Sequence, residues 1–162
     1  MRKLLSVVAV VFAGWAVANC GGGGGGSQDC DSLCQKLQAS GCEQDFNMQE
    51  CQAECNWGKA NLQSAFFNES AKCLDQPCAQ QAQCAENAMS KCVMPSNKDT
   101  VIDAYCAKSV ECQESPDVNT CKTAIGTMMD VALMCLNSNG ISTTSSCISG
   151  STCEDFGNNT CF

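Results

Sequence analysis

The chain has 162 residues, of which seventeen are cysteine and none is histidine, and its formal net charge at pH 7 is −8. The lack of histidine excludes Ser-His-Asp and Cys-His catalysis and His-ligated metal sites, and the acidic surplus argues against nucleic-acid binding, which needs a basic surface. So much cysteine in a chain of this length is typical of an exported domain held together by disulfides.

Residues 1–19 have the form of an export signal. Arg2 and Lys3 precede an apolar run from Leu4 to Ala18, as in the charged and apolar regions of a signal peptide. That run has fifteen residues, fewer than the ~20 that a helix needs to cross a bilayer. We therefore expect a signal peptide at 1–19 and an exported remainder, which carries seven basic and seventeen acidic residues and a net charge of −10.

The leader ends in Val17-Ala18-Asn19-Cys20, and six glycines follow. This ending resembles the lipobox of bacterial lipoproteins, in which the cysteine is acylated and becomes the first residue. The resemblance implies that Cys20 carries a lipid, and the glycine-rich segment 20–29 is then a flexible tether. Parity agrees, since the sixteen other cysteines can form eight disulfides. Plain cleavage after Ala18, which would give a secreted protein, is the alternative.

The segment 30–92 is expected to be helical. Gly41 ends a first helix that starts near Cys30. Asn47 begins a second helix that runs to about Phe67, and a third is expected over 79–92. The first helix carries its apolar residues on one face, namely Cys30, Leu33, Cys34 and Leu37.

After a connection at 93–101, the segment 102–162 is expected to be helical as well. One helix is expected over 100–113. Another begins near Pro116 and runs to about Cys135, with Asn139-Gly140 as its stop. The Ser/Thr/Gly-rich stretch 141–153 is expected to be a loop. The predicted fold class is therefore an all-α, disulfide-rich domain with little or no strand.

Cysteine spacing indicates two degenerate copies, 30–92 and 102–162, joined by 93–101. Equal spacing matches Cys42 with Cys112, Cys51 with Cys121, Cys73 with Cys135, and the triplet Cys78, Cys84 and Cys92 with the triplet Cys147, Cys153 and Cys161. Cys34 matches Cys106, whereas Cys30 and Cys55 have no match. Each copy thus has seven shared cysteines, an odd number, so complete oxidation requires at least one bond between the copies.

The exported part is poor in large apolar residues. Leu, Ile, Val and Phe make up twenty of the 142 residues after Cys20, and an unlinked chain of this composition tends to disorder. Each disulfide lowers the entropy of the unfolded chain and typically contributes ~2–4 kcal/mol. We therefore expect the sixteen other cysteines to be oxidised and the fold to be lost on reduction.

Two cysteine pairs, Cys30-x3-Cys34 and Cys51-x3-Cys55, resemble the double C-x3-C pattern of disulfide-locked helical hairpins. The resemblance implies an antiparallel hairpin with an outer bond Cys30–Cys55 and an inner bond Cys34–Cys51. The second copy has only the inner pair, Cys106–Cys121. The remaining cysteines are expected to be paired with partners left open: Cys42, Cys73, Cys78, Cys84, Cys92, Cys112, Cys135, Cys147, Cys153 and Cys161.

The sequence points to a protein that is not an enzyme. No catalytic motif occurs, no two cysteines are closer than four positions apart, so C-x-x-C redox and zinc motifs are absent, and no catalytic residue, cofactor or metal is expected. The chain resembles small cysteine-rich bacterial lipoproteins of unknown function, which implies a lipid-anchored envelope protein with a structural or interaction role. Its membrane contact would be the N-terminal lipid, and no nucleic-acid partner is expected.

Two alternatives stay open. Thiolates on helices, as at Cys30 and Cys34 or at Cys51 and Cys55, would suit Cu(I), which favours soft sulfur ligands, so the chain would then store copper. The other alternative is a secreted inhibitor or ligand-binding module, which would need an exposed apolar patch. The identity of any protein or ligand partner is left open.

Overall fold

The computed structural model describes residues 29–161 except 44 and 159. Helices make up the regular structure of this part, and no strand occurs among these residues, so the predicted all-α class is confirmed. The described residues divide at Cys92 and Val93 into two compact units, which we treat separately. None of the described helices combines the length and the hydropathy that a membrane span requires.

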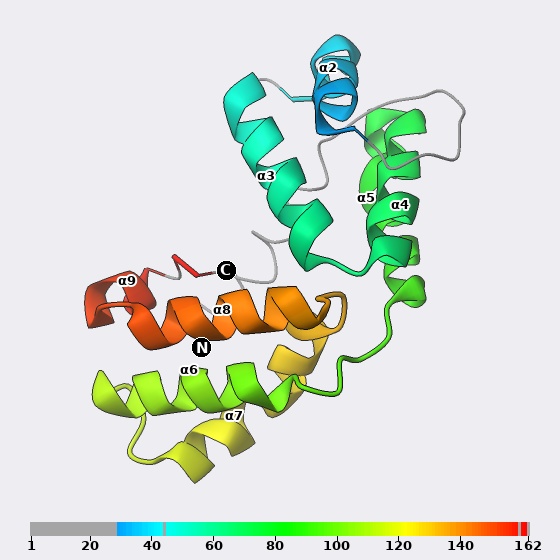
Figure 1. Ribbon diagram of the computed structural model, residues 1–162. Coiled ribbons are helices and arrows are strands. Elements are labelled where there is room, and N and C mark those ends of the chain that lie inside the picture. Colours follow the sequence, from blue (N-terminus) through cyan, green and yellow to red (C-terminus); the bar gives the residue numbers. More distant parts are fainter. Residues whose placement is uncertain (1–28, 44, 159, 162) are drawn as a thin grey trace. The chain divides into compact units, whose positions relative to one another are not determined.

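The first unit is built from four α-helices and two short 3-10 turns. In chain order these are α2 (Cys30–Ser40), α3 (Met48–Asn61), α4 (Ser64–Lys72), η1 (Cys73–Asp75), α5 (Cys78–Ala88) and η2 (Met89–Lys91). Helices α2 and α3 pack against each other as a hairpin, and α4 packs against α3 and α5 (Figure 1).

The ends of the hairpin helices follow the local sequence. Asp29 caps α2 by accepting from the backbone N–H of Ser32 at 3.3 Å. Gly41 ends α2 with φ 66°, a left-handed conformation that glycine adopts without a Cβ clash. Asn47 caps α3 by accepting from the backbone N–H groups of Gln49 and Glu50 at 3.0 and 3.3 Å. Both predicted boundaries are therefore confirmed.

The single helix expected from Asn47 to about Phe67 is wrong, because two helices occupy this stretch. Helix α3 ends at Asn61, and Leu62 is extended, with φ −95° and ψ 158°. Asn61 donates its side-chain amide to the Trp57 carbonyl at 2.8 Å, a local bond that competes with continuation of a helix. The break at Leu62 lets α4 start in a new direction. Phe66 and Phe67 of α4 are both buried, even though the side chains of consecutive helix residues point about 100° apart.

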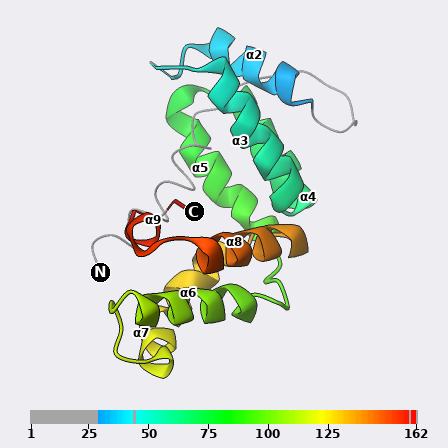
Figure 2. The same ribbon diagram turned by 60° about the vertical axis from the view of Figure 1, so that its left-hand side comes forward.

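The second unit has four helices. They are α6 (Asp99–Glu111), α7 (Val118–Leu133), α8 (Ser138–Gly150) and α9 (Cys153–Gly157). Helix α6 packs against α7, α8 and α9, and α8 lies alongside α6 in both views (Figures 1 and 2). The rings of Tyr105 on α6 and Phe156 on α9 meet with their centroids 4.9 Å apart.

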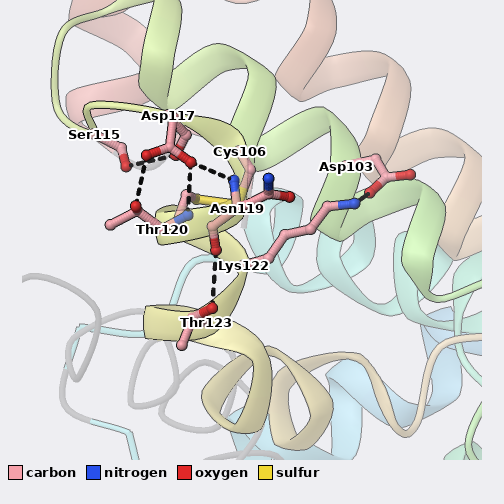
Figure 3. Close-up of a disulfide and its surroundings, with 9 residues drawn as sticks. Asp103, Cys106, Ser115, Asp117, Asn119, Thr120, Lys122 and Thr123 are labelled. Atoms are coloured by element: carbon pink, nitrogen blue, oxygen red, sulfur yellow. Dashed lines mark hydrogen bonds and ion pairs between the residues drawn. A yellow bond between two sulfur atoms is a disulfide. The ribbon is translucent and has the colours of Figure 1, made fainter.

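Polar contacts fix the hairpin of α6 and α7 around its disulfide (Figure 3). Asp117 caps α7 by accepting from the backbone N–H groups of Asn119 and Thr120 at 2.9 and 3.0 Å. The Thr120 hydroxyl also donates to the Asp117 carboxylate at 2.6 Å. Lys122 of α7 forms an ion pair with Asp103 of α6 at 2.5 Å. Helix α7 therefore begins at Val118, directly after its Asp117 cap and two residues after the start expected near Pro116.

The loop expected over 141–153 is wrong, because most of this stretch belongs to α8. Asn137 caps α8 by accepting from the backbone N–H of Gly140 at 2.9 Å, so Asn139-Gly140 lies in the first turn of α8 and does not terminate α7. Ile141, Thr144 and Ile148 form its buried face at the i, i+3 and i+7 positions of an amphipathic helix. The Ser and Thr residues around this short stripe hid it in the sequence.

Candidate functional site

The sixteen cysteines of the described part are all disulfide-bonded. Pairing on this scale is typical of an oxidising, extracytoplasmic compartment and of a structural, extracellular type of protein. Cys20, the residue predicted to carry a lipid, lies outside the described residues.

The three bonds implied by the hairpin resemblance are present. Cys30 bonds to Cys55 and Cys34 to Cys51 between α2 and α3, with Cα separations of 5.7 and 5.9 Å. Cys106 bonds to Cys121 between α6 and α7, with a separation of 5.5 Å. The outer and inner cysteines of the first hairpin therefore meet as in an antiparallel helix pair.

Four further bonds involve cysteines whose partners the sequence left open. They are Cys42–Cys78, Cys73–Cys84, Cys112–Cys153 and Cys147–Cys161. Cys92 and Cys135 are also disulfide-bonded. In each unit, one of these bonds therefore joins a cysteine that follows the first helix to the last α-helix. The other joins η1 to α5 in the first unit, and α8 to Cys161 in the second.

These bonds differ from the cysteine matching that equal spacing suggested for two copies. In each unit, a cysteine just after the first helix bonds to the first residue of the last α-helix: Cys42 to Cys78 of α5, and Cys112 to Cys153 of α9. Cys78 therefore corresponds to Cys153 and not, as equal spacing suggested, to Cys147. The spacings of six and eight coincide without reflecting the fold.

In this corrected register the two units share three bonds. The matched bonds are Cys34–Cys51 with Cys106–Cys121, Cys42–Cys78 with Cys112–Cys153, and Cys73–Cys84 with Cys147–Cys161. Cys92 and Cys135 have no counterpart in the other unit. The likeness between the halves thus lies in the connectivity and the helix order more than in the sequence spacing.

In this structure the cysteines expected to bind copper are not free thiolates. Cu(I) would be held by thiolates, but Cys30, Cys34, Cys51 and Cys55 are oxidised in the two hairpin bonds. Among the described residues, no group of three or more His, Cys, Asp or Glu side chains is placed to hold a metal ion.

The first unit contains a cavity of about 340 Å³ beside the double-disulfide hairpin. Its apolar wall comes from α2, α4 and η1, and consists of Leu33, Leu37, Phe67, Ala71 and Leu74. Three disulfide-bonded cysteines, Cys34, Cys51 and Cys55, also line the cavity. Since these cysteines are cross-linked, the wall is held in place by covalent bonds as well as by packing.

Four carboxylates lie around the same cavity. Glu43 and Asp45 come from the connection between α2 and α3, and Glu50 and Glu54 come from α3. Among the described residues of the lining there is no Lys or Arg. Partial burial raises the pKa of Glu54 above its ordinary value, and the charges of Glu50 and Glu43 raise that pKa further. The cavity therefore joins an apolar wall to an uncompensated negative charge.

Ser70 is the polar residue that α4 contributes to this lining. Its side chain is buried, with 7% of the residue exposed, and its Oγ has no hydrogen-bond partner. A buried hydroxyl without a partner costs about 1–3 kcal/mol of desolvation, and such orphaned groups are uncommon in folded proteins. An unsatisfied hydroxyl next to a cavity is thus a feature that a bound molecule could satisfy.

The sequence interpretation missed this site. The acidic residues gave a weak indication of the site. Glu43 shortly precedes α3, and Glu50 and Glu54 are four residues apart and therefore share one face of that helix. Part of the apolar wall comes from α4, which was expected to continue α3. A wrong helix boundary therefore concealed the convergence of the two sets of residues.

Comparison with known proteins reveals no relationship. No family model matches the chain, and no curated protein or solved structure matches it significantly. Function is therefore inferred from the residues, the disulfides and the cavity alone.

Proposed function

We propose that this chain is an exported bacterial envelope protein, anchored by a lipid on Cys20, whose disulfide-stapled helical part has a non-enzymatic role in structure or interaction. The observation that carries the proposal is the complete pairing of the sixteen other cysteines. Of seventeen cysteines in the chain, this leaves Cys20, at the end of a lipobox-like leader, available for acylation.

The glycines after Cys20 and the charge of the exported part support the same proposal. A Gly-rich segment behaves as a flexible chain and would hold a folded domain away from the membrane surface. An exported part with a net charge of −10 is repelled by anionic lipid, so stable membrane attachment needs a covalent anchor.

Replacing Cys20 by Ser tests the anchor. The expected result in a lipoprotein-processing bacterium is a shift of the protein from the membrane fraction to the soluble exported fraction, with unchanged helical circular dichroism. The intact mass of the wild-type protein should correspond to a chain that starts at Cys20 and carries acyl groups, with no alkylation of thiols before reduction. A Cys20→Ser protein that stays in the membrane fraction would refute the lipid anchor.

A second candidate function, ligand binding, is favoured by the cavity of the first unit. Small-molecule sites are commonly concave, mostly apolar and about 300–1,000 Å³ in volume, with a few polar groups that fix orientation. The cavity of about 340 Å³ with its apolar wall, four carboxylates and buried hydroxyl has these features. Ligand binding is compatible with a lipid anchor, and its test is independent of Cys20.

A further inference from the structure

We propose that the cavity of the first unit binds a small organic cation, an ammonium whose apolar body carries a hydrogen-bonding group. This inference names the ligand class for the second candidate function and rests on it. It depends on three features of the cavity: its wall, its charge and the Ser70 hydroxyl.

The wall sets the body of the ligand. Leu33 and Leu37 of α2 face the cavity from one helix, and Phe67 and Leu74 line it from α4 and η1. Burying the apolar surface of a ligand against this wall favours binding, and an aromatic ring can stack on Phe67. A volume of about 340 Å³ suits a small molecule and is too small for a folded partner.

The charge sets the sign of the ligand. Glu43, Asp45, Glu50 and Glu54 lie around the cavity, and none of the other lining residues that the structure describes is basic. Like charges that lie close together repel each other, and a bound cation relieves this repulsion. These carboxylates are not grouped to ligate a metal ion, so a diffuse organic cation fits them better than a bare metal.

The Ser70 hydroxyl sets the last requirement. Ser70 lies on α4 among Phe67, Ala71 and Leu74, and its Oγ is buried without a partner. A ligand group that donates to or accepts from this hydroxyl recovers part of its desolvation cost. The acidic residues come from α3 and the connection before it, so the ammonium and the hydrogen-bonding group occupy different ends of the ligand.

Tyramine is a suitable probe, because it joins an ammonium, an aromatic ring and a hydroxyl. We would titrate it by calorimetry into the full-length Cys20→Ser protein, which needs no detergent that could fill the cavity. Two matched compounds isolate the features: 3-(4-hydroxyphenyl)propionate replaces the cation by an anion, and phenethylamine lacks the hydroxyl. Tyramine should bind at least about tenfold more tightly than the anion.

Variants of the protein assign the effect to residues. The double variant Glu50→Gln/Glu54→Gln should weaken tyramine binding by about tenfold. Glu86→Gln, which removes an exposed carboxylate of α5 outside the cavity, should leave it unchanged. Ser70→Ala should abolish a preference of about three- to tenfold for tyramine over phenethylamine, without lowering stability, because it removes an unsatisfied buried group.

The outcomes separate this inference from the lipid anchor. If the anion binds as tightly as tyramine, or if neither ammonium compound binds at millimolar concentration, the inference is wrong while membrane anchoring by Cys20 is untouched. Equal weakening by Glu86→Gln and by the double variant would also overturn it, because the charge effect would then not be local to the cavity. Failure of Cys20→Ser to leave the membrane would instead refute the anchor and leave these titrations valid.

Discussion

The carboxylate of Asp117 shows how one side chain can begin a helix. It accepts from two backbone N–H groups of the first turn of α7 and from the Thr120 hydroxyl. The side-chain hydrogen bond from Thr120 is the largest cause that lowers the pKa of Asp117 below its ordinary value, and the backbone bonds from Thr120 and Asn119 add to it. Asp29 at the start of α2 has a lowered pKa for the same reason, with Ser32 as the donor. Neither cap was predicted, and the start of α7 was expected near Pro116, although the chemistry of these caps is local.

Replacing Asp117 by Ala should lower the thermal midpoint of the second unit at neutral pH, because three hydrogen bonds to the cap are lost. The folded-state pKa lies below the unfolded value of ~3.9, so the stabilisation is present above that value and is lost as pH falls through the folded-state pKa. The difference between the wild type and Asp117→Ala should therefore shrink in strong acid.

Asp117→Asn is the matched control, because an amide oxygen can still accept from the helix while the charge is removed. Its thermal midpoint should stay close to that of the wild type at neutral pH and lack this acid-dependent component. Melting curves recorded by circular dichroism between pH 7 and pH 2 would check this. A wild-type minus Asp117→Ala difference that stays constant over the whole range would contradict the assigned cap.

Whole helices were predictable where an end signal and an apolar stripe agreed. Asn47 and Gly41 marked the boundaries of the first hairpin, and its cysteines fixed the pairing through a known helical pattern. The prediction was wrong for two elements, for opposite reasons. The break at Leu62 lies inside a continuous apolar stripe, and α8 has a stripe of three residues among Ser and Thr. The buried face of α8 forms by packing against α6, which is distant in sequence, and no local window contains that contact. The cavity was not predicted because the break at Leu62 was missed, since α4 supplies Phe67 and Ala71 of its apolar wall.

The outer bond of the first hairpin provides a test at this scale. The double variant Cys30→Ala/Cys55→Ala removes a bond with a sequence separation of 25 and should lower the free energy of unfolding of the first unit by ~3 kcal/mol. The helices should persist at low denaturant, because the inner bond Cys34–Cys51 still closes the hairpin.

Two intrinsic fluorophores make this measurement specific. Once the leader is removed, Trp57 of α3 is the sole tryptophan, and Tyr105 of α6 is the sole tyrosine of the chain. In urea, the Trp57 transition should move to lower concentration and the Tyr105 transition should not. The reciprocal variant Cys106→Ala/Cys121→Ala should move the Tyr105 transition. If the first double variant shifted neither signal, the bond would contribute no stability to its hairpin.

On the scale of the whole chain, complete oxidation of the sixteen cysteines after Cys20 was predictable, although most of their pairing was not. A count alone indicated complete oxidation, but partners such as Cys42 and Cys78 are 36 positions apart and are joined only by the fold. The corrected register adds a finer regularity. Cys30 and Cys55, which lack counterparts in the second unit, bond to each other. Unmatched cysteines thus pair with unmatched cysteines, which is expected when three shared bonds are common to both halves.

The same count predicts that a disulfide joins the two halves. The first half has nine cysteines from Cys30 to Cys92, and the second has seven; four and three bonds, respectively, lie within them. With every one of the sixteen oxidised, one cysteine is left over in each half, so the bond expected between the two copies stays a prediction. We predict that the unmatched Cys92 and Cys135 supply it.

A protease site inserted between Val93 and Met94, two exposed residues of the connection, would test this bond. After cleavage, the halves should migrate as one species on a denaturing gel without reductant and as two species with it. In a Cys92→Ser/Cys135→Ser background, cleavage alone should separate them, while Trp57 and Tyr105 still report folded units. Separation of the wild-type halves without reductant would show that the covalent link is absent, because non-covalent contacts do not survive the denaturing gel.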